Sequence, residues 1–139
     1  NLQIDSVLYS DGSTAKFTLG KADPILGAAL SIPIKEDTKE LQIFYKTLEN
    51  ATALQWLEPS QTFGKEAPFL YTQSESIHVR TWIPSPDSPG ARFTYDAKVK
   101  VPEGLLALMS AENPQKKSED GVYQFTMNEK IPGYCGMPW

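Results

Sequence analysis

The sequence predicts an all-β fold, an antiparallel β-sandwich, and three observations support this prediction. Apolar and polar residues alternate with a period of two in several stretches, which is typical of strands with one buried face. Eleven prolines and nine glycines divide the 139 residues into short stretches, as the turns of a sandwich require. No stretch has the apolar period that a long amphipathic helix would need.

The clearest strand is expected over residues 93–101. Polar residues of this stretch should face solvent, because successive side chains of a strand point to opposite faces. The apolar residues that alternate with them are predicted to face one core: Phe93, Tyr95, Ala97, Val99 and Val101. Further strands are predicted over residues 2–9, 15–19, 30–34, 41–45, 53–57, 69–72, 79–83, 105–110 and 123–127.

A turn is expected at Ser10-Asp11-Gly12-Ser13, between the first two of these strands. Asp and Gly favour tight turns between strands, so residues 2–19 are predicted to form a β-hairpin.

The composition limits the possible functions. A length of 139 residues suggests one domain. The net charge of −4 comes without a basic stripe, which argues against a nucleic-acid partner. No run of about 18 apolar residues occurs, so no membrane span is expected. The single cysteine excludes an internal disulfide and leaves the compartment open between cytoplasmic and periplasmic or secreted.

The chain alone is predicted to carry neither a metal site nor a catalytic site. A zinc site needs three or four ligands from Cys, His, Asp or Glu. The sequence has one histidine, His78, far from its one cysteine, Cys135, and it lacks H-E-x-x-H. Neither a G-x-S-x-G elbow nor a glycine-rich phosphate loop is present.

One polar stretch, "YTQSESIH" at residues 71–78, invites a functional interpretation. It places His78 three residues after the carboxylate of Glu75 and near the amide of Gln73. From the residues alone, Glu75 is expected to be a solvated strand residue. His78 is expected to be a packed or hydrogen-bonded strand residue.

Residues 69–114 resemble the N-terminal β domain of the gluzincin zinc aminopeptidases, the family of aminopeptidase N and leukotriene-A hydrolase. The resemblance is strongest to the branch of leukotriene-A hydrolase and the cold-active aminopeptidases. It is carried by an aromatic pair before T-Q-x-E-x-I-H, by T-Y-x-A-x-V-x-V-P, and by "LMSAENP" at residues 108–114. Flanking matches include "LQIFYKT", "LQWLEPSQTFGK" and "FTMNEKIP", so the resemblance extends nearly to Tyr134.

This resemblance implies a fold, partners and site residues. It implies a saddle-like β domain over residues 1–139 that is a fragment lacking its first and last strands. Such a domain docks on its own catalytic domain, which is thermolysin-like and holds the zinc. The Q-x-Q/E segment, here Gln73 and Glu75, would form a strand edge that binds the free α-amine of a peptide N-terminus. By the same resemblance, glutamine stands at the Glu75 position in leukotriene-A hydrolase. The carboxylate of Glu75 would favour a cationic amine, and so aminopeptidase activity over hydrolysis of a lipid epoxide.

The resemblance therefore implies a non-catalytic N-terminal domain of a metallo-aminopeptidase, inactive by itself and without a cofactor of its own. The alternative is a stand-alone β-sandwich that serves as a binding or adhesion module.

Overall fold

The computed structural model describes residues 1–136 and confirms the all-β, antiparallel fold. The only α-helix among these residues is α1, Gly133–Gly136, and two single-turn 3₁₀ helices cover Pro59–Gln61 and Val79–Thr81. The strands are β1 Leu2–Tyr9, β2 Thr18–Leu19, β3 Leu30–Ser31, β4 Leu41–Thr47, β5 Leu54–Leu57, β6 Phe69–Thr72, β7 Arg92–Lys100 and β8 Val122–Pro132.

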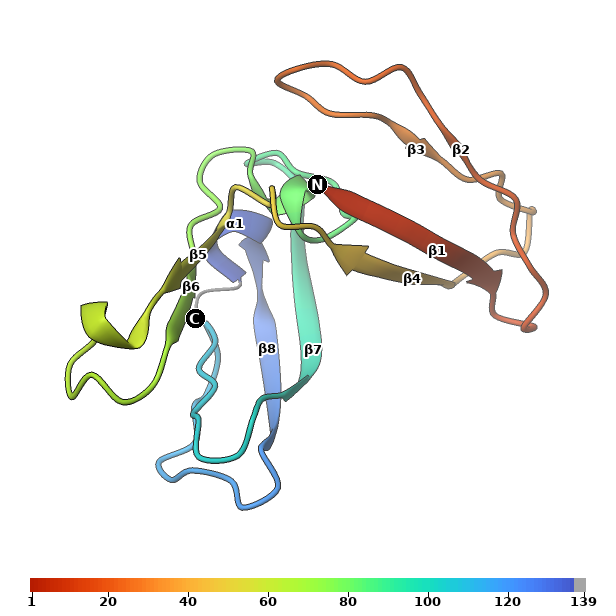
Figure 1. The fold of residues 1–139 in the computed structure, drawn as a ribbon. Coiled ribbons are helices and arrows are strands. Elements are labelled where there is room, and N and C mark those ends of the chain that lie inside the picture. Colours follow the sequence, from red (N-terminus) through yellow and green to blue (C-terminus); the bar gives the residue numbers. More distant parts are fainter. Residues whose placement is uncertain (137–139) are drawn as a thin grey trace. The chain divides into compact units, whose positions relative to one another are not determined.

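The strands pair two by two into antiparallel sheets (Figure 1): β1 with β4, β2 with β3, β5 with β6, and β7 with β8. The chain divides into two compact units. The first unit comprises residues 1–51 and 80–84, and the second comprises residues 52–79 and the chain from Ser85 onward.

In the first unit, β1 pairs with β4 in a register that shifts between Ile4 and Ser6. Asp5 is the extra residue, and such a bulge reverses which face the following side chains take. Ile4 lies opposite Tyr45 before the shift, and Val7 lies opposite Ile43 after it. The bulge therefore keeps the apolar residues of β1 on one face, although their spacing in the sequence changes from even to odd.

The predicted hairpin over residues 2–19 is wrong as a pairing, although its turn forms. The turn is closed by hydrogen bonds from the Gly12 N–H to the Tyr9 carbonyl and from the Tyr9 N–H to the Ser13 carbonyl, both at 2.9 Å. Beyond one isolated bridge between Leu8 and Thr14, the chain leaves β1. The longer apolar face of β4 then provides the partner strand for β1.

The second unit contains the main core, on one face of the β7–β8 pair. Tyr123 and Phe125 of β8 are buried together with Ala107. Of the residues predicted to face this core, Tyr95, Ala97, Val99 and Val101 pack against it, whereas Phe93 is half-buried and does not belong to this cluster. Along β7, half-buried and exposed residues alternate strictly. The predicted register of residues 93–101 is thus confirmed, and Thr94, Asp96 and Lys98 lie on the exposed side.

Two predicted strands are absent. Residues 79–83 begin with a 3₁₀ helix, in which Val79 and Thr81 are buried. The alternation in the sequence therefore indicates which side chains are buried, and it does not indicate a strand paired in a sheet. Residues 105–110 have no strand partner in the described part of the chain. Two of their carbonyls accept instead from tyrosine hydroxyls: Tyr123 donates to Leu105 at 2.8 Å and Tyr95 donates to Ser110 at 2.9 Å.

Candidate functional site

The candidate site is the turn at residues 73–78, which follows β6 directly. The sequence predicted a strand edge here, and the structure corrects this to a turn, because β6 ends at Thr72. Gln73 and Glu75 are both exposed, whereas Ser74 between them is only 3% exposed. Burial of Ser74 leaves its two neighbours facing solvent.

Hydrogen bonds fix the path of this turn. The Gln73 N–H donates to the Ala53 carbonyl at 2.8 Å, and the His78 N–H donates to the Ser74 carbonyl at 3.0 Å. The Glu75 N–H donates to the Gln73 side-chain carbonyl at 3.1 Å. His78 Nδ1 lies 3.0 Å from Thr52 Oγ1. The Glu75–Ser76 peptide bond within the turn is cis.

These bonds give Gln73 and Glu75 different chemical capacities. The Gln73 Oε1 atom already accepts the Glu75 N–H, so its NH₂ group provides donors toward a ligand. The Glu75 carboxylate provides acceptors only, and it binds a cationic donor more strongly than a neutral one. The turn therefore offers one acidic acceptor and one amide donor two residues apart.

The sequence suggested that His78 is a strand residue. In the structure it lies instead at the end of the turn. Its ring bonds the Thr52 hydroxyl, which agrees with the expectation of a hydrogen-bonded histidine. No sequence signal pointed to Thr52, because it lies 26 positions before His78 and belongs to no motif with it.

Within residues 1–136, no group of three or more His, Cys, Asp or Glu side chains is placed to hold a metal ion. None of the helices within these residues is long and apolar enough to cross a membrane.

The carboxylates with lowered pKa values lie in turns away from residues 73–78. Hydrogen bonds from the side chain and N–H of Ser13 lower the pKa of Asp11. The N–H groups of Leu26 and Ile25 do the same for the pKa of Asp23. Hydrogen bonds from the Ser118 hydroxyl and the Val122 N–H lower the pKa of Asp120. These aspartates stabilise turns, and none has a geometry that suggests acid–base chemistry.

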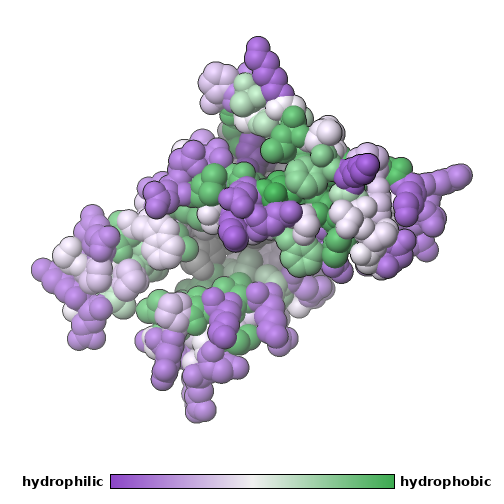
Figure 2. Space-filling view, turned by 45° about the vertical axis from the view of Figure 1, so that its right-hand side comes forward, coloured by the Kyte–Doolittle hydropathy of each residue, from purple (hydrophilic) through white to green (hydrophobic). Residues whose placement is uncertain are grey.

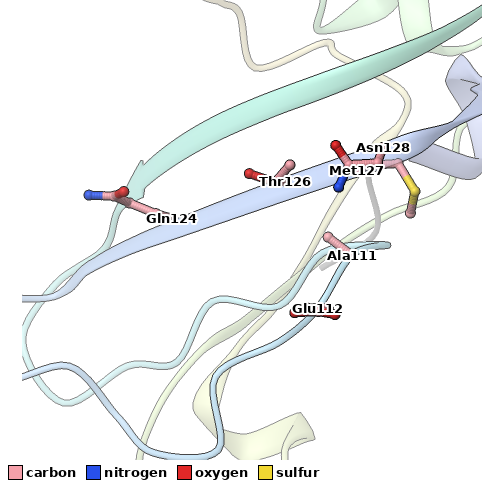
Figure 3. A pocket seen from close by; sticks show the side chains of 6 residues that line it. All are labelled: Ala111, Glu112, Gln124, Thr126, Met127 and Asn128. Carbon is pink, nitrogen blue, oxygen red and sulfur yellow. The ribbon is translucent and has the colours of Figure 1, made fainter.

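A separate pocket of about 600 Å³ lies beside β8. Figure 3 shows Gln124, Thr126 and Asn128 along the strand, with Ala111 and Glu112 on the loop that runs beside it. Among the described residues that line it, Glu112 is the only charged one, and neither Gln73 nor Glu75 lines it. One carboxylate among amides and a hydroxyl does not define a ligand class.

Comparisons with known proteins agree on one family. Residues 2–135 match the Peptidase M1 N-terminal domain. Leucine aminopeptidase 2 of Yarrowia lipolytica is 35% identical in an alignment of 128 positions that covers 89% of this chain and 19% of that protein. Leukotriene A-4 hydrolase of Xenopus laevis is 36% identical in an alignment of 134 positions that covers 89% of this chain and 22% of that protein.

The fold agrees with the same family. The solved structure of native leukotriene A4 hydrolase from Saccharomyces cerevisiae superposes with a TM-score of 0.83 at 31% identity. The superposition covers 96% of this chain and 20% of the yeast protein. The chain thus spans about a fifth of the length of the relatives that it matches.

Proposed function

Because this chain belongs to the Peptidase M1 N-terminal domain family, we propose that its turn at residues 73–78 recognises the free α-amine of a peptide substrate in a zinc aminopeptidase. Glu75 accepts hydrogen bonds from the substrate ammonium. Gln73 holds the Glu75 backbone and offers amide donors to a substrate carbonyl. The observation that supports this proposal most directly is that Gln73 and Glu75 are both exposed on a turn whose backbone is fixed by hydrogen bonds.

The chemistry supports this assignment. A carboxylate and an ammonium form a charge-assisted hydrogen bond, which is roughly twice as strong as a neutral one. Only the first residue of a peptide carries a free α-ammonium, so an acceptor at this place favours N-terminal residues over internal ones. An exopeptidase needs this preference, since it must reject the interior of a chain.

In the proposed enzyme, zinc would be held outside residues 1–136, because these residues offer no cluster of metal ligands. When bound, zinc would supply an activated water for peptide hydrolysis. The part of this domain is to bind and orient the substrate amine, so that the peptide enters the site in one register.

We further propose that the β5–β6 hairpin docks on the catalytic domain of the same enzyme. In this hairpin Trp56 lies opposite Leu70, and Leu57 lies opposite Phe69. Paired residues share a face and successive ones do not, so both faces carry apolar side chains. Trp56 is 65% exposed and Phe69 is 45% exposed. Figure 2 shows hydrophobic residues at the surface among hydrophilic ones. The proposed docking partner of this hairpin is the rest of the aminopeptidase, the four fifths of the relatives' length that this chain does not cover.

The test is Glu75→Ala in the complete aminopeptidase, assayed on one aminoacyl substrate at equal folded concentration. Loss of a charge-assisted hydrogen bond should lower kcat/KM by roughly 10–150-fold. Glu75→Gln should cost less, because the amide still accepts a hydrogen bond from the ammonium. An unchanged kcat/KM in Glu75→Ala would show that Glu75 does not recognise the substrate amine, and the proposal would fail.

A further inference from the structure

We propose that Thr52 and His78 form a positioning pair that holds the turn carrying Glu75 in its amine-binding conformation. This inference rests on the proposed function. Neither residue touches the substrate in this account. They act through the backbone of residues 73–78, and their effect on the reaction must therefore pass through Glu75.

The first support is that both ends of the turn are fixed to the same short segment. At its start, the Gln73 N–H donates to the carbonyl of Ala53 at 2.8 Å. At its end, His78 Nδ1 lies 3.0 Å from Thr52 Oγ1. Thr52 and Ala53 are consecutive residues just before β5, so one stretch of backbone determines where the turn begins and where it ends.

The second support is the way the turn closes on itself. The His78 N–H donates to the Ser74 carbonyl at 3.0 Å, across the residues that include Glu75. Ser74 is buried, and so is Val79, which follows His78. The exposed residues between them thus start and finish at packed positions. The contact between the His78 ring and Thr52 adds a side-chain bond at the end of the turn to the backbone bond that Ala53 makes at its start.

The third support is the chemistry of the pair. A threonine hydroxyl both donates and accepts, so it can bond either tautomer of a histidine ring. Ala53 is fully buried, whereas Thr52 is exposed. The backbone of this segment is therefore fixed by packing, and the Thr52 side chain is left to contact the turn. A displacement of about 1 Å at a binding group can cost as much as 100-fold in rate, so a modest anchor can matter.

The experiment compares Thr52→Val with wild type in the complete aminopeptidase, on one aminoacyl substrate. Valine keeps the shape of threonine but cannot bond His78, and kcat/KM should fall by roughly 2–10-fold. Thr52→Ser keeps the hydroxyl and should retain most of the activity. Thr94→Val is the matched control, because Thr94 is an exposed threonine on β7, and it should change nothing.

The discriminating readout is a double-mutant cycle with Glu75→Ala. If Thr52 acts by positioning Glu75, Thr52→Val should cost nothing further once Glu75 is alanine, and the two effects should not add. A general loss of structure would lower kcat/KM by the same factor in both backgrounds. His78→Phe removes the ring nitrogen from the other side of the contact, and it should show the same loss and the same dependence on Glu75.

Three results would overturn the inference: equal losses in both backgrounds, a loss in Thr52→Ser as large as in Thr52→Val, or no loss in Thr52→Val while Glu75→Ala is impaired. In the third case the proposed function stands and only the positioning pair is lost. If Glu75→Ala itself costs nothing, the proposed function fails first and the pair fails with it.

Discussion

At the scale of residues, the turn at 73–78 shows how one side chain can serve two purposes. The Gln73 amide oxygen holds the Glu75 N–H at 3.1 Å, and its NH₂ group remains a donor. A glutamine can do this because its acceptor and donor sit on the same planar group. The two residues of the Q-x-E motif are thus tied to each other, and the intervening Ser74 is buried.

Residue-level chemistry was only partly predictable from the sequence. Gln73 and Glu75 could be selected because they belong to a local motif with a recognisable spacing. Thr52 could not, because its contact with His78 depends on how the segment before β5 passes beside the turn. No local pattern encodes a contact between positions that far apart.

A further residue-level prediction concerns Asp120, whose pKa is lowered from 3.8 by hydrogen bonds from the Ser118 hydroxyl and the Val122 N–H. A lowered pKa in the folded state means that the carboxylate stabilises the fold above the unfolded pKa. This contribution is lost as the pH falls through the folded value. Asp120→Asn should therefore lower the thermal unfolding midpoint at neutral pH, and the difference from wild type should shrink below pH 3.8.

The matched control for Asp120→Asn is Glu119→Gln, which removes the same charge from the neighbouring exposed residue. The unfolding midpoints of both variants would be measured from neutral pH down to about 2. The comparison separates the effect of the lost Asp120 hydrogen bonds on the midpoint from the effect of the changed net charge. Equal shifts in the two variants at every pH would contradict a specific role for Asp120.

At the scale of elements, strict alternation was a reliable guide where it was long. Residues 93–101 kept their predicted register because slipping by one position would expose every apolar residue of the strand. Short alternations were ambiguous: residues 79–83 contain a 3₁₀ turn, and residues 105–110 form neither a strand nor a helix. In both stretches the alternation marks which side chains are buried, which several backbone conformations can satisfy.

Strand partners were the least predictable feature of the elements. The turn at Ser10–Ser13 forms as expected, but β1 takes β4 as its main partner. A local turn signal fixes where the chain reverses. It does not fix which distant strand offers the longer apolar face, and β4 supplies that face through residues 41–47.

At the scale of the whole molecule, the chain is a β domain with an exposed turn at residues 73–78 and with no cluster of metal ligands within residues 1–136. The function proposed above assigns substrate contacts to this turn and the catalytic chemistry to another domain of the same enzyme.

This interpretation predicts the behaviour of the 139-residue chain on its own. It should bind no zinc stoichiometrically after dialysis and should release no product from an aminoacyl substrate, because a zinc site needs at least three protein ligands in place. Metal analysis and a sensitive peptidase assay on the same preparation check both points. One tightly held zinc per chain would contradict the division of labour between domains.

The most direct test of amine recognition by Glu75 is a comparison of two ligands that differ only in the α-amine. An amino-acid hydroxamate and its des-amino analogue would be titrated against the complete aminopeptidase, as wild type and as Glu75→Ala. Wild type should bind the amine-bearing ligand more tightly than the des-amino analogue, by a factor on the order of 10 or more. Glu75→Ala should lose most of this preference while binding the des-amino analogue as before. An unchanged preference for the amine in Glu75→Ala would refute amine recognition by Glu75, because some other group would then be recognising the substrate N-terminus.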